Sequence, residues 1–329
     1  MKILVTGCFG FIGINFLKYA LKNNKHKIVG VDKLTYASNK KYKYNFLKNK
    51  NFVFYKIDIN SKKIENIINK EKPTHIINFA AESHVDNSIT KPEKFITSNI
   101  KGVYNLLYFS LKYYNKLKPT IKNKFRFVQI STDEVYGSVS KGLASEKNKY
   151  IPNSPYSASK ASADHLVNAW NITYGLPTII TNSCNNYGPF QNKEKLIPKT
   201  IASIFKNKEI LLYGNGKNIR EWIYVEDHIL ILYNILKKGK VGNTYNIGSN
   251  FRISNIDLIK ILIKKYCEIK NNKDEKKIID KIKYIKDRLG HDYRYALNTN
   301  KLKKLYKIKN LLLFEEGLLK TLNWYNQNK

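Results

Sequence analysis

The chain has 329 residues, of which 43% are hydrophobic and 26% are charged. These proportions are ordinary for a globular protein and argue against disorder, and the length favours two domains of roughly 150 residues each. No apolar run reaches the roughly 18 residues of a transmembrane helix, so we expect no membrane partner. The three widely spaced cysteines exclude a disulfide framework and favour a reducing, cytoplasmic compartment.

The formal net charge is +34, from 59 basic and 25 acidic residues. A charge this large has two interpretations: a nucleic-acid or anionic-membrane partner, or a compositional bias toward lysine. We favour the bias, because the basic residues are spread along the whole chain and no RNA-binding motif or basic amphipathic helix gathers them. We therefore expect no nucleic-acid partner, although a positive field would still attract an anionic substrate.

Arginine is rare in this lysine-rich chain. Its planar guanidinium grips phosphate with two hydrogen bonds and stacks on flat rings, which the lysine ammonium cannot do. A chain that uses lysine by default should retain arginine mainly where lysine fails. We therefore treat all the arginines as candidate site residues, while expecting some to be retained by chance: Arg126, Arg220, Arg252, Arg288 and Arg294.

In chain order, short apolar runs predict strands and amphipathic stretches between them predict helices. The predicted strands are Lys2–Thr6, Lys27–Val31 ending at Asp32, Phe52–Ile57, His75–Phe79, Phe125–Ile130 and Thr178–Thr181. The predicted helices include one that ends at about Asn23, and the stretches Lys94–Tyr114 and Ala158–Tyr174. Strands that alternate with helices indicate an α/β fold with a doubly wound parallel sheet.

The regular alternation weakens after about Asn182. We therefore expect a Rossmann-type domain over residues 1–182, with residues from about 221 to 249 returning to it. Residues 183–329 are expected to form mainly a smaller α/β domain that binds substrate. The charge run Lys270–Lys277 is most simply a solvated loop.

A glycine-rich turn follows the first predicted strand. Gly7, Gly10 and Gly13 form a Gly-x-x-Gly-x-x-Gly pattern that opens a predicted helix. Such glycines let the backbone approach a pyrophosphate at the positive helix N-terminus. Asp32, at the end of the second strand, is placed to bind a ribose 2′-hydroxyl and to repel a 2′-phosphate. The pattern predicts a dinucleotide site that favours NAD, while the neighbouring Lys33 leaves NADP open.

Tyr156 and Lys160 stand at positions i and i+4, on one face of a predicted helix. A free tyrosine has a pKa of about 10 and is a poor base at neutral pH. A neighbouring ammonium stabilises the phenolate and should lower the pKa of Tyr156. Together with the glycine turn, this pair predicts hydride transfer, in which Tyr156 removes a hydroxyl proton while the carbon gives its hydride to NAD.

Thr132, Asp133 and Glu134 follow a predicted parallel strand, at the end where ligands bind in such sheets. The acidic pair either caps a helix or faces solvent, or it supplies an acid and a base whose roles are set by different environments. Beside an oxidising Tyr–Lys pair, two further carboxyl groups favour an elimination. One would remove a proton next to a new ketone, and the other would protonate a departing hydroxyl.

A set of motifs along nearly the whole chain is shared with one enzyme family. The motifs are Thr6–Gly13, Asp32–Ala37, Ala80–Asp86, Ser131–Gly137, Pro152–Ala161, Asn185–Pro189, Glu194–Pro198, Arg220–His228 and Lys286–Asp292. Through them the chain resembles the dTDP-glucose 4,6-dehydratases of the extended short-chain dehydrogenase/reductase superfamily. The Thr-Asp-Glu motif is specific within this resemblance, because related epimerases lack the acidic pair.

The resemblance implies an NAD-dependent lyase that dehydrates a nucleotide-linked glucose without net oxidation. Tyr156, assisted by Thr132 and Lys160, would deprotonate the C4 hydroxyl as hydride passes to NAD. Glu134 would then remove the C5 proton while Asp133 protonates the C6 hydroxyl, so that water leaves. Return of hydride to C6 and of a proton to C5 would give the 4-keto-6-deoxyglucose nucleotide.

The motifs and the resemblance together predict two adjoining binding sites and no metal. The expected cofactor residues are Gly7, Gly10, Phe11, Ile12, Gly13, Asp32, Lys33, Asp58, Ile59, Ala80, Ala81, Asn99, Tyr156 and Lys160. Asp58 has the alternative interpretation of a turn or helix cap. The expected substrate residues are Ser83, His84, Asn185, Glu194, Lys195, Leu196, Arg220, Asn255, Arg288, His291 and Tyr295. For Arg126, Arg252 and Arg294 chance retention remains the interpretation.

Three further points remain open from the sequence. The sequence departs from the family pattern at several positions; Asn87, for example, stands where the family has an arginine, and Leu289 where it has a proline. These departures leave open which nucleotide base the substrate carries. Thymine and uracil differ by one methyl, worth roughly 1–3 kcal/mol in a pocket, so UDP-glucose is an alternative substrate. A sugar-nucleotide 4-epimerase is the alternative activity. The resemblance also implies a homodimer formed through the helices at 94–114 and 158–174.

Overall fold

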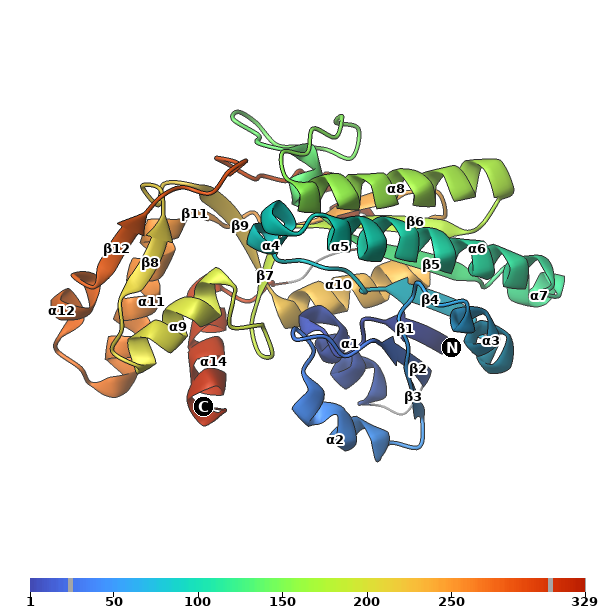
Figure 1. The fold of residues 1–329 in the computed structure, drawn as a ribbon, viewed down its shortest axis with the longest axis horizontal. Coiled ribbons are helices and arrows are strands. Elements are labelled where there is room, and N and C mark those ends of the chain that lie inside the picture. The colour runs from blue at the N-terminus through green and yellow to red at the C-terminus, as the bar shows by residue number, and fades with distance from the viewer. Residues whose placement is uncertain (23–25, 307–309, 329) are drawn as a thin grey trace.

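The computed structural model describes residues 1–22, 26–306 and 310–328. Figure 1 shows a sheet with helices on both faces, and beside it a second group of helices and short strands. Within the described residues, no helix is long and apolar enough to cross a bilayer.

In the described part of the chain, seven strands form one parallel sheet in the order β10-β6-β5-β4-β1-β2-β3. They are β1 (Lys2–Thr6), β2 (Lys27–Asp32), β3 (Phe52–Lys56), β4 (His75–Asn78), β5 (Arg126–Thr132), β6 (Thr178–Ser183) and β10 (Thr244–Ile247). The chain order reverses between β1 and β4, which in such sheets opens a crevice at the carboxyl ends of the strands. The predicted doubly wound fold is confirmed, and β5 extends further than predicted, through Thr132.

Helices bury both faces of this sheet, which explains its near-continuous apolar strands. On one face lie α1 (Phe11–Leu21) and α10 (Val225–Lys238). On the other face lie α3 (Lys63–Glu71), α6 (Gly102–Asn115) and α8 (Pro155–Tyr174). The arrangement can be followed in Figure 1, where α6 and α8 run side by side. Residue 23, where the sequence placed the end of the first helix, lies outside the described residues.

Helix α8 begins at Pro155, before the predicted start at Ala158. The side chain of Ser154 accepts a hydrogen bond from the Ser157 backbone N–H, and the Ser157 hydroxyl accepts one from the Ser154 N–H. This reciprocal cap, with proline at the first helical position, starts the helix earlier. Tyr156 consequently lies in the first turn.

The predicted helix at 94–114 is a chain of three helical segments. They are α5 (Glu93–Phe95), a π-helical turn η2 (Ile96–Lys101) and α6. Shorter elements elsewhere are η1 (Lys40–Tyr42), α2 (Lys43–Leu47), α4 (Val85–Thr90), α7 (Pro119–Lys122), η3 (Asp133–Tyr136) and α13 (Asn300–Leu305).

A second core lies beyond β6 in the chain. Its strands are β7 (Asn185–Tyr187), β9 (Ile219–Tyr224) and β11 (Arg252–Ser254) in one sheet, and β8 (Ile210–Tyr213) paired with β12 (Ile282–Ile285). Its helices are α9 (Leu196–Phe205), α11 (Asn255–Lys270), α12 (Glu275–Ile279) and α14 (Phe314–Gln327). Between these elements the chain returns through α10 and β10 to the main sheet. The solvated loop predicted over Lys270–Lys277 is shorter than expected, because α12 already begins at Glu275.

Candidate active site

Two cavities meet at the carboxyl edge of the main sheet. The first, of about 230 Å³, lies over the glycine turn, and the second, of about 520 Å³, lies between β5 and the second core. The residues that line both are Phe11, Ile12, Ser83, Ser131, Tyr156, Gln191, Glu194 and Lys195. A ligand in the first cavity can therefore meet a ligand in the second beside Tyr156.

The glycine turn leaves no room for side chains. Gly7 has a φ of +62°, and a Cβ added to it would lie 2.6 Å from the Ala80 nitrogen. A Cβ on Gly13 would collide with the Gly7 carbonyl oxygen. The turn leads into the N-terminus of α1, whose first N–H groups have no partner inside the helix. Bare backbone and a positive helix end form a cradle that fits a pyrophosphate.

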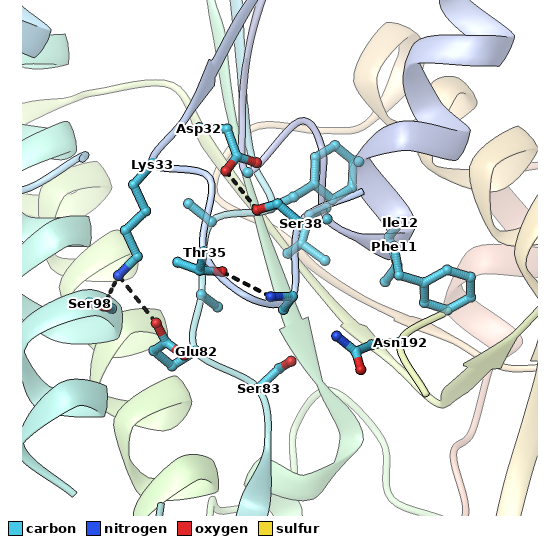
Figure 2. A pocket seen from close by; sticks show the side chains of 18 of the residues that line it. Phe11, Ile12, Asp32, Lys33, Thr35, Ser38, Glu82, Ser83, Ser98 and Asn192 are labelled. Atoms are coloured by element: carbon cyan, nitrogen blue, oxygen red, sulfur yellow. Dashed lines mark hydrogen bonds and ion pairs between the residues drawn. The ribbon is translucent and has the colours of Figure 1, made fainter. Parts of the chain in front are cut away.

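The carboxylate of Asp32 lines the first cavity at the end of β2 (Figure 2). It accepts hydrogen bonds from the backbone N–H groups of Phe9 at 2.9 Å and Leu34 at 2.7 Å. The hydroxyl of Ser38 donates a third, at 3.0 Å. These donors fix a negative charge where the sequence placed the ribose.

Lys33 also lines this cavity, but its charge is already compensated (Figure 2). Its ammonium lies 3.2 Å from a Glu82 oxygen and 3.7 Å from an Asp58 oxygen, and it donates to the Ser98 hydroxyl at 3.0 Å. Two carboxylates therefore lie beside this ammonium, and a third, that of Asp32, lines the same cavity. This acidic rim would repel a 2′-phosphate, which favours NAD over NADP.

Most of the other predicted cofactor residues line the same cavity. They are Gly10, Phe11, Ile12, Asp58, Ile59, Ala80, Ala81, Tyr156 and Lys160. Asp58 fits both of its interpretations, because it lines the cavity and also accepts the Asn60 N–H at 2.9 Å, as a turn cap does.

Asn99 is the exception among the predicted cofactor residues, because it does not line the cavity. Its amide is buried and accepts the Glu82 N–H at 2.8 Å, while it donates to the Ser159 hydroxyl at 2.9 Å. Asn99 thus ties the segment after β4 to α8. Asn99 was predicted to contact the cofactor, but in the structure it supports the cofactor cavity by holding two of its neighbouring segments together.

Tyr156 lies on α8 at the junction of the cavities, and Lys160, on the same helix, lines the first cavity. The Tyr156 hydroxyl forms a hydrogen bond with Thr132. Burial raises the pKa of Tyr156, and the charges of Glu134 and Asp133 raise it further. Lys160 donates instead to the Ile130 carbonyl, at 2.5 Å. The predicted lowering of the tyrosine pKa is therefore wrong for this arrangement, because burial and the carboxylates outweigh the ammonium.

The acidic pair after β5 is divided between two environments. Thr132 caps η3 by accepting the Glu134 N–H at 3.3 Å, so the capping role falls to the hydroxyl rather than to the carboxylates. Asp133 is 2% exposed, and burial raises its pKa well above the usual range, with help from the charges of Glu134 and Glu221. Its side chain lies outside the lining of both cavities.

Glu134 lines the second cavity. Burial raises its pKa overall, and the positive charges of Arg288, Arg220 and Lys195 only reduce that rise. Of the two carboxyl groups, Asp133 therefore favours the protonated form and Glu134 is the one held near cations. Such divergent environments assign an acid and a base.

The predicted substrate residues all line the second cavity. They are Ser83, His84, Asn185, Glu194, Lys195, Leu196, Arg220, Asn255, Arg288, His291 and Tyr295. The elements that carry them are the segment after β4, β7, the loop before α9, β9, the start of α11 and the segment after β12. Residues far apart in the sequence thus form one wall.

Two arginines supply cations to this cavity. The Arg220 guanidinium stacks on the Tyr295 ring at 4.2 Å and donates to the Asp292 carbonyl at 2.8 Å. Arg288 lies 3.8 Å from an Asp86 oxygen, and its buried Nε has no hydrogen-bond partner among the described residues. An unsatisfied buried donor in a cavity rich in cations fits an anionic ligand such as a diphosphate.

The other three arginines line neither cavity, and chance retention remains their interpretation. Arg126 donates to the carbonyls of Asn123 and Phe125. Arg294 donates to the carbonyls of Val139 and Gly142. Arg252 pairs with the fully buried Glu221 at 2.8 Å. In each case the contacts come from a single guanidinium nitrogen, so they show no need for the forked guanidinium.

Sequence reasoning missed several residues of the second cavity, of which Tyr213 is the clearest. Its hydroxyl donates to Asp86 at 2.9 Å, and its ring meets that of His291 edge to face, with centroids 6.4 Å apart. No motif pointed to Tyr213. Asp86 stood in a recognised motif but was assigned no role. Others missed are Asn186, Gln191, Lys193, Lys199, Leu211, Leu212 and Trp222.

Metal and thiol chemistry have no visible site in the described residues. No group of three or more His, Cys, Asp and Glu side chains gathers there in a way that could hold a metal ion. Burial raises the pKa of the thiols of Cys8, Cys184 and Cys267, which keeps them protonated and unreactive.

A dinucleotide cradle, a Tyr-x-x-x-Lys pair and an adjoining anion-binding cavity define an extended short-chain dehydrogenase/reductase of the nucleotide-sugar class. The family model for GDP-mannose 4,6 dehydratase matches residues 4–321. Within this class the chain belongs to the dTDP-glucose 4,6-dehydratase family, because full-length relatives of that name are more than two-fifths identical to it.

The chain is similar to these relatives in both sequence and structure. The dTDP-glucose 4,6-dehydratase of Haemophilus influenzae is 44% identical over 99% of this chain and 98% of its own length. That of Escherichia coli is 45% identical over 100% and 94%. The Streptomyces venezuelae enzyme, solved with NAD and dTDP bound, has a TM-score of 0.89 and 34% identity over 100% and 98%. A UDP-glucuronic acid 4-epimerase from Bacillus cereus, with NAD, has a TM-score of 0.87 but 25% identity over the full length of both chains.

Proposed function

We propose that the protein is an NAD-dependent hydro-lyase that converts dTDP-glucose into the 4-keto-6-deoxyglucose nucleotide and water. The observation that carries this proposal is the convergence of Tyr156 and Glu134 on the second cavity, with Asp133, whose pKa is raised by burial, next to Glu134 in the chain. The family relatives support the same reaction.

The first cavity has the chemistry that NAD requires. Gly7, Gly10 and Gly13 would take the pyrophosphate, and Asp32 the ribose of the adenosine. When bound, NAD accepts a hydride from the sugar and later returns it. Because loss of the reduced cofactor would strand the oxidised sugar, the cofactor should remain bound throughout a turnover.

In the first step Tyr156 takes the proton of the C4 hydroxyl, and the C4–H bond breaks as a hydride leaves. The pKa of Tyr156 is raised by burial, so positive charge must favour its phenolate. The ammonium of Lys160 and the oxidised nicotinamide ring supply such charge, and Thr132 donates a hydrogen bond to the phenolate oxygen.

In the second step Glu134 removes the C5 proton, which the new C4 ketone has made acidic. The C5–C6 double bond forms, the C6–O bond breaks, and Asp133 gives its proton by way of the Thr132 hydroxyl, which lines the cavity and lies 3.2 Å from Asp133 Oδ1, so that water leaves. In the third step hydride returns to C6 and Glu134 returns a proton to C5. Tyr156 has then gained one proton and Asp133 has lost one, so a single proton transfer restores the enzyme.

Two finer choices belong to this proposal. The relatives favour thymine as the base, and UDP-glucose remains the alternative substrate. A 4-epimerase shares the fold, but an epimerase has no use for the acid and base that Asp133 and Glu134 provide.

We also assign NAD binding to residues 1–182 together with about 221–249, and substrate binding mainly to residues 183–329. We place the enzyme in the cytoplasm.

A deuterium experiment tests the function. Purified protein is incubated in deuterated water with dTDP-glucose or UDP-glucose, and no NAD is added. The expected product has lost one water and carries one solvent deuteron at C5, seen by mass spectrometry and NMR. An isomer of unchanged mass would show an epimerase instead. The nucleotide sugar that is converted faster would identify the preferred base, thymine or uracil.

A homodimer is proposed on the exposed face of α6 and α8. Tyr104, Tyr108, Ile172 and Tyr174 are large hydrophobic residues there that are 42–75% exposed. Tyr104 contacts Trp170, with ring centroids 5.8 Å apart, so the two helices present one continuous apolar face. Such faces mark protein–protein contacts.

Light scattering at micromolar concentration tests the dimer. The native protein should have twice the mass of one chain, and Ile172→Glu should give a folded monomer, because a charge cannot be buried in that face. Leu313→Glu, at a residue that is 68% exposed elsewhere on the molecule, is the matched control and should remain a dimer. A native monomer would contradict this proposal.

A further inference from the structure

Helix α8 carries a buried carboxyl group beyond the catalytic pair. Tyr156, Lys160 and Asp164 stand at positions i, i+4 and i+8, so they share one face of the helix. Lys160 is 4% exposed and Asp164 is 1% exposed. The reaction described above uses Tyr156 and Lys160 but gives Asp164 no role.

Both side chains are held against neighbouring residues of β5. The Lys160 ammonium donates to the Ile130 carbonyl, and the Ser131 hydroxyl donates to Asp164 Oδ2, each at 2.5 Å. Ser131 lines both cavities, so this contact reaches the place where cofactor and sugar would meet. The carboxyl group is therefore tied to the site through the strand as well as through the helix.

A second group of contacts supports Asp164 from behind. The hydroxyl of Tyr150 forms a hydrogen bond with the Asp164 carboxyl group. Tyr150 is itself held by the Asn182 amide, which donates to its hydroxyl at 3.0 Å and to that of Tyr136 at 2.9 Å. A polar group fixed by several partners in a dry interior keeps one geometry.

Lys160 and Asp164 are not in direct contact, but their charges act on each other through the buried interior. Burial lowers the pKa of Lys160, and the negative charge of Asp164 raises it. Burial raises the pKa of Asp164 to about 7, and the charge of Lys160 and the hydrogen bonds from Ser131 and Tyr150 act in the opposite direction. A buried ammonium needs such a partner to stay charged.

The other titratable groups around the pair are tyrosines. Tyr136 and Tyr150 come from the segment after β5, and Tyr156 from the same helix. Burial raises the pKa of all three, so they are neutral near pH 7 and add no charge. The opposite charge that acts on Lys160 is therefore that of Asp164.

We propose that Asp164 is a positioning residue that keeps Lys160 charged and fixed against β5, and thereby sets the upper pH limit of the C4 oxidation. The inference rests on the proposed function through the role given to Lys160. Asp164 itself contacts neither cavity, so it acts on the reaction through Lys160 and Ser131 and through the effect of its charge on Tyr156.

The test is the pH profile of Asp164→Asn. Asparagine keeps the shape and can still accept from Ser131, but it removes the negative charge. The pKa of Lys160 should then fall, so the alkaline decline of kcat should move down by about one to three pH units. KM for dTDP-glucose should be unchanged. A kcat reduced equally at every pH, or a profile that coincides with the native one, would overturn the inference.

Two further variants make the test specific. Tyr150→Phe keeps the carboxyl group but removes a donor to it, so Asp164 stays protonated to higher pH and the profile should shift less, in the same direction. Asp227→Asn is the matched control. Asp227 is half-buried on α10 and accepts the Leu312 N–H at 2.9 Å, outside both cavities, and its pKa is also raised by burial. Its substitution should leave the profile unchanged.

A readout without turnover separates this inference from the proposed function. Lys160 lines the cofactor cavity, so its charge should also affect NAD binding. Calorimetric titration of the cofactor-stripped protein with NAD should show affinity falling at lower pH in Asp164→Asn than in the native protein. Coincident binding curves would refute the role of Asp164, whereas a native protein that binds NAD but forms no product would refute the proposed function alone.

Discussion

Replacing Glu134 by glutamine is expected to lower kcat by about 10²–10⁴-fold while bound NADH still forms on mixing with dTDP-glucose. Glutamine fills the same space beside Arg288 and Lys195 but cannot accept the C5 proton. Oxidation at C4 does not need Glu134, so the reaction should stop at the oxidised sugar. Stopped-flow absorbance of NADH, followed by product analysis, measures both steps.

Tyr156→Phe is the matched contrast for this experiment. It removes the base of the first step, so NADH formation and product formation should fall together, by a similar factor. Both variants should retain the native content of bound NAD. Full turnover by Glu134→Gln, or loss of NADH formation in both variants alike, would contradict the assignment of the two residues to different steps.

The second large effect concerns stability. Arg252→Leu is expected to lower the free energy of unfolding by about 3 kcal/mol, because it leaves the charge of Glu221 buried without its cation. Glu221 is fully buried and accepts the backbone N–H groups of Asn250 at 2.9 Å and Leu297 at 3.1 Å. These contacts join β9 and β11 to the segment before α13, so the loss should appear in denaturant unfolding followed by fluorescence.

Two comparisons isolate the charge in that experiment. The double variant Arg252→Leu with Glu221→Gln removes both charges but keeps an acceptor for the amides, and it should recover most of the lost stability. Arg126→Leu removes an arginine that donates only to nearby carbonyls. Its effect should lie within about 0.5 kcal/mol. Equal losses in the single and double variants would show that the buried charge is not the cause.

The parts of the fold that were predictable are those with a strong local pattern. All strands of the main sheet up to β6 were placed from apolar runs, since strands buried on both faces must be apolar. The helix containing Tyr156 was predicted to start too late, because its capping box has Ser157 at the position where glutamate or glutamine usually marks a helix start. The short strands of the second core were not predicted, because they pair with segments distant in the sequence.

The site shows the same division. Glycine spacing, the Tyr156–Lys160 spacing and the acidic pair were readable, and the family resemblance placed the substrate residues that line the second cavity. The supporting role of Asn99 and the presence of Tyr213 were not readable. The position of each of these two residues in the site depends on which distant segment packs against it, and no local sequence pattern predicts that packing.

By itself, the sequence determined the sheet, the dinucleotide turn and the chemical groups of the site, because these depend on residue type and on spacing within a few turns. Only the tertiary structure decided what those groups do. Burial raises the pKa of both Asp133 and Glu134, but only Glu134 lines the second cavity, near cations from β9, the loop before α9 and the segment after β12, which is why we propose Asp133 as the acid and Glu134 as the base. The pKa of a side chain is set by burial and by charges across space, and both arise only when the chain has folded.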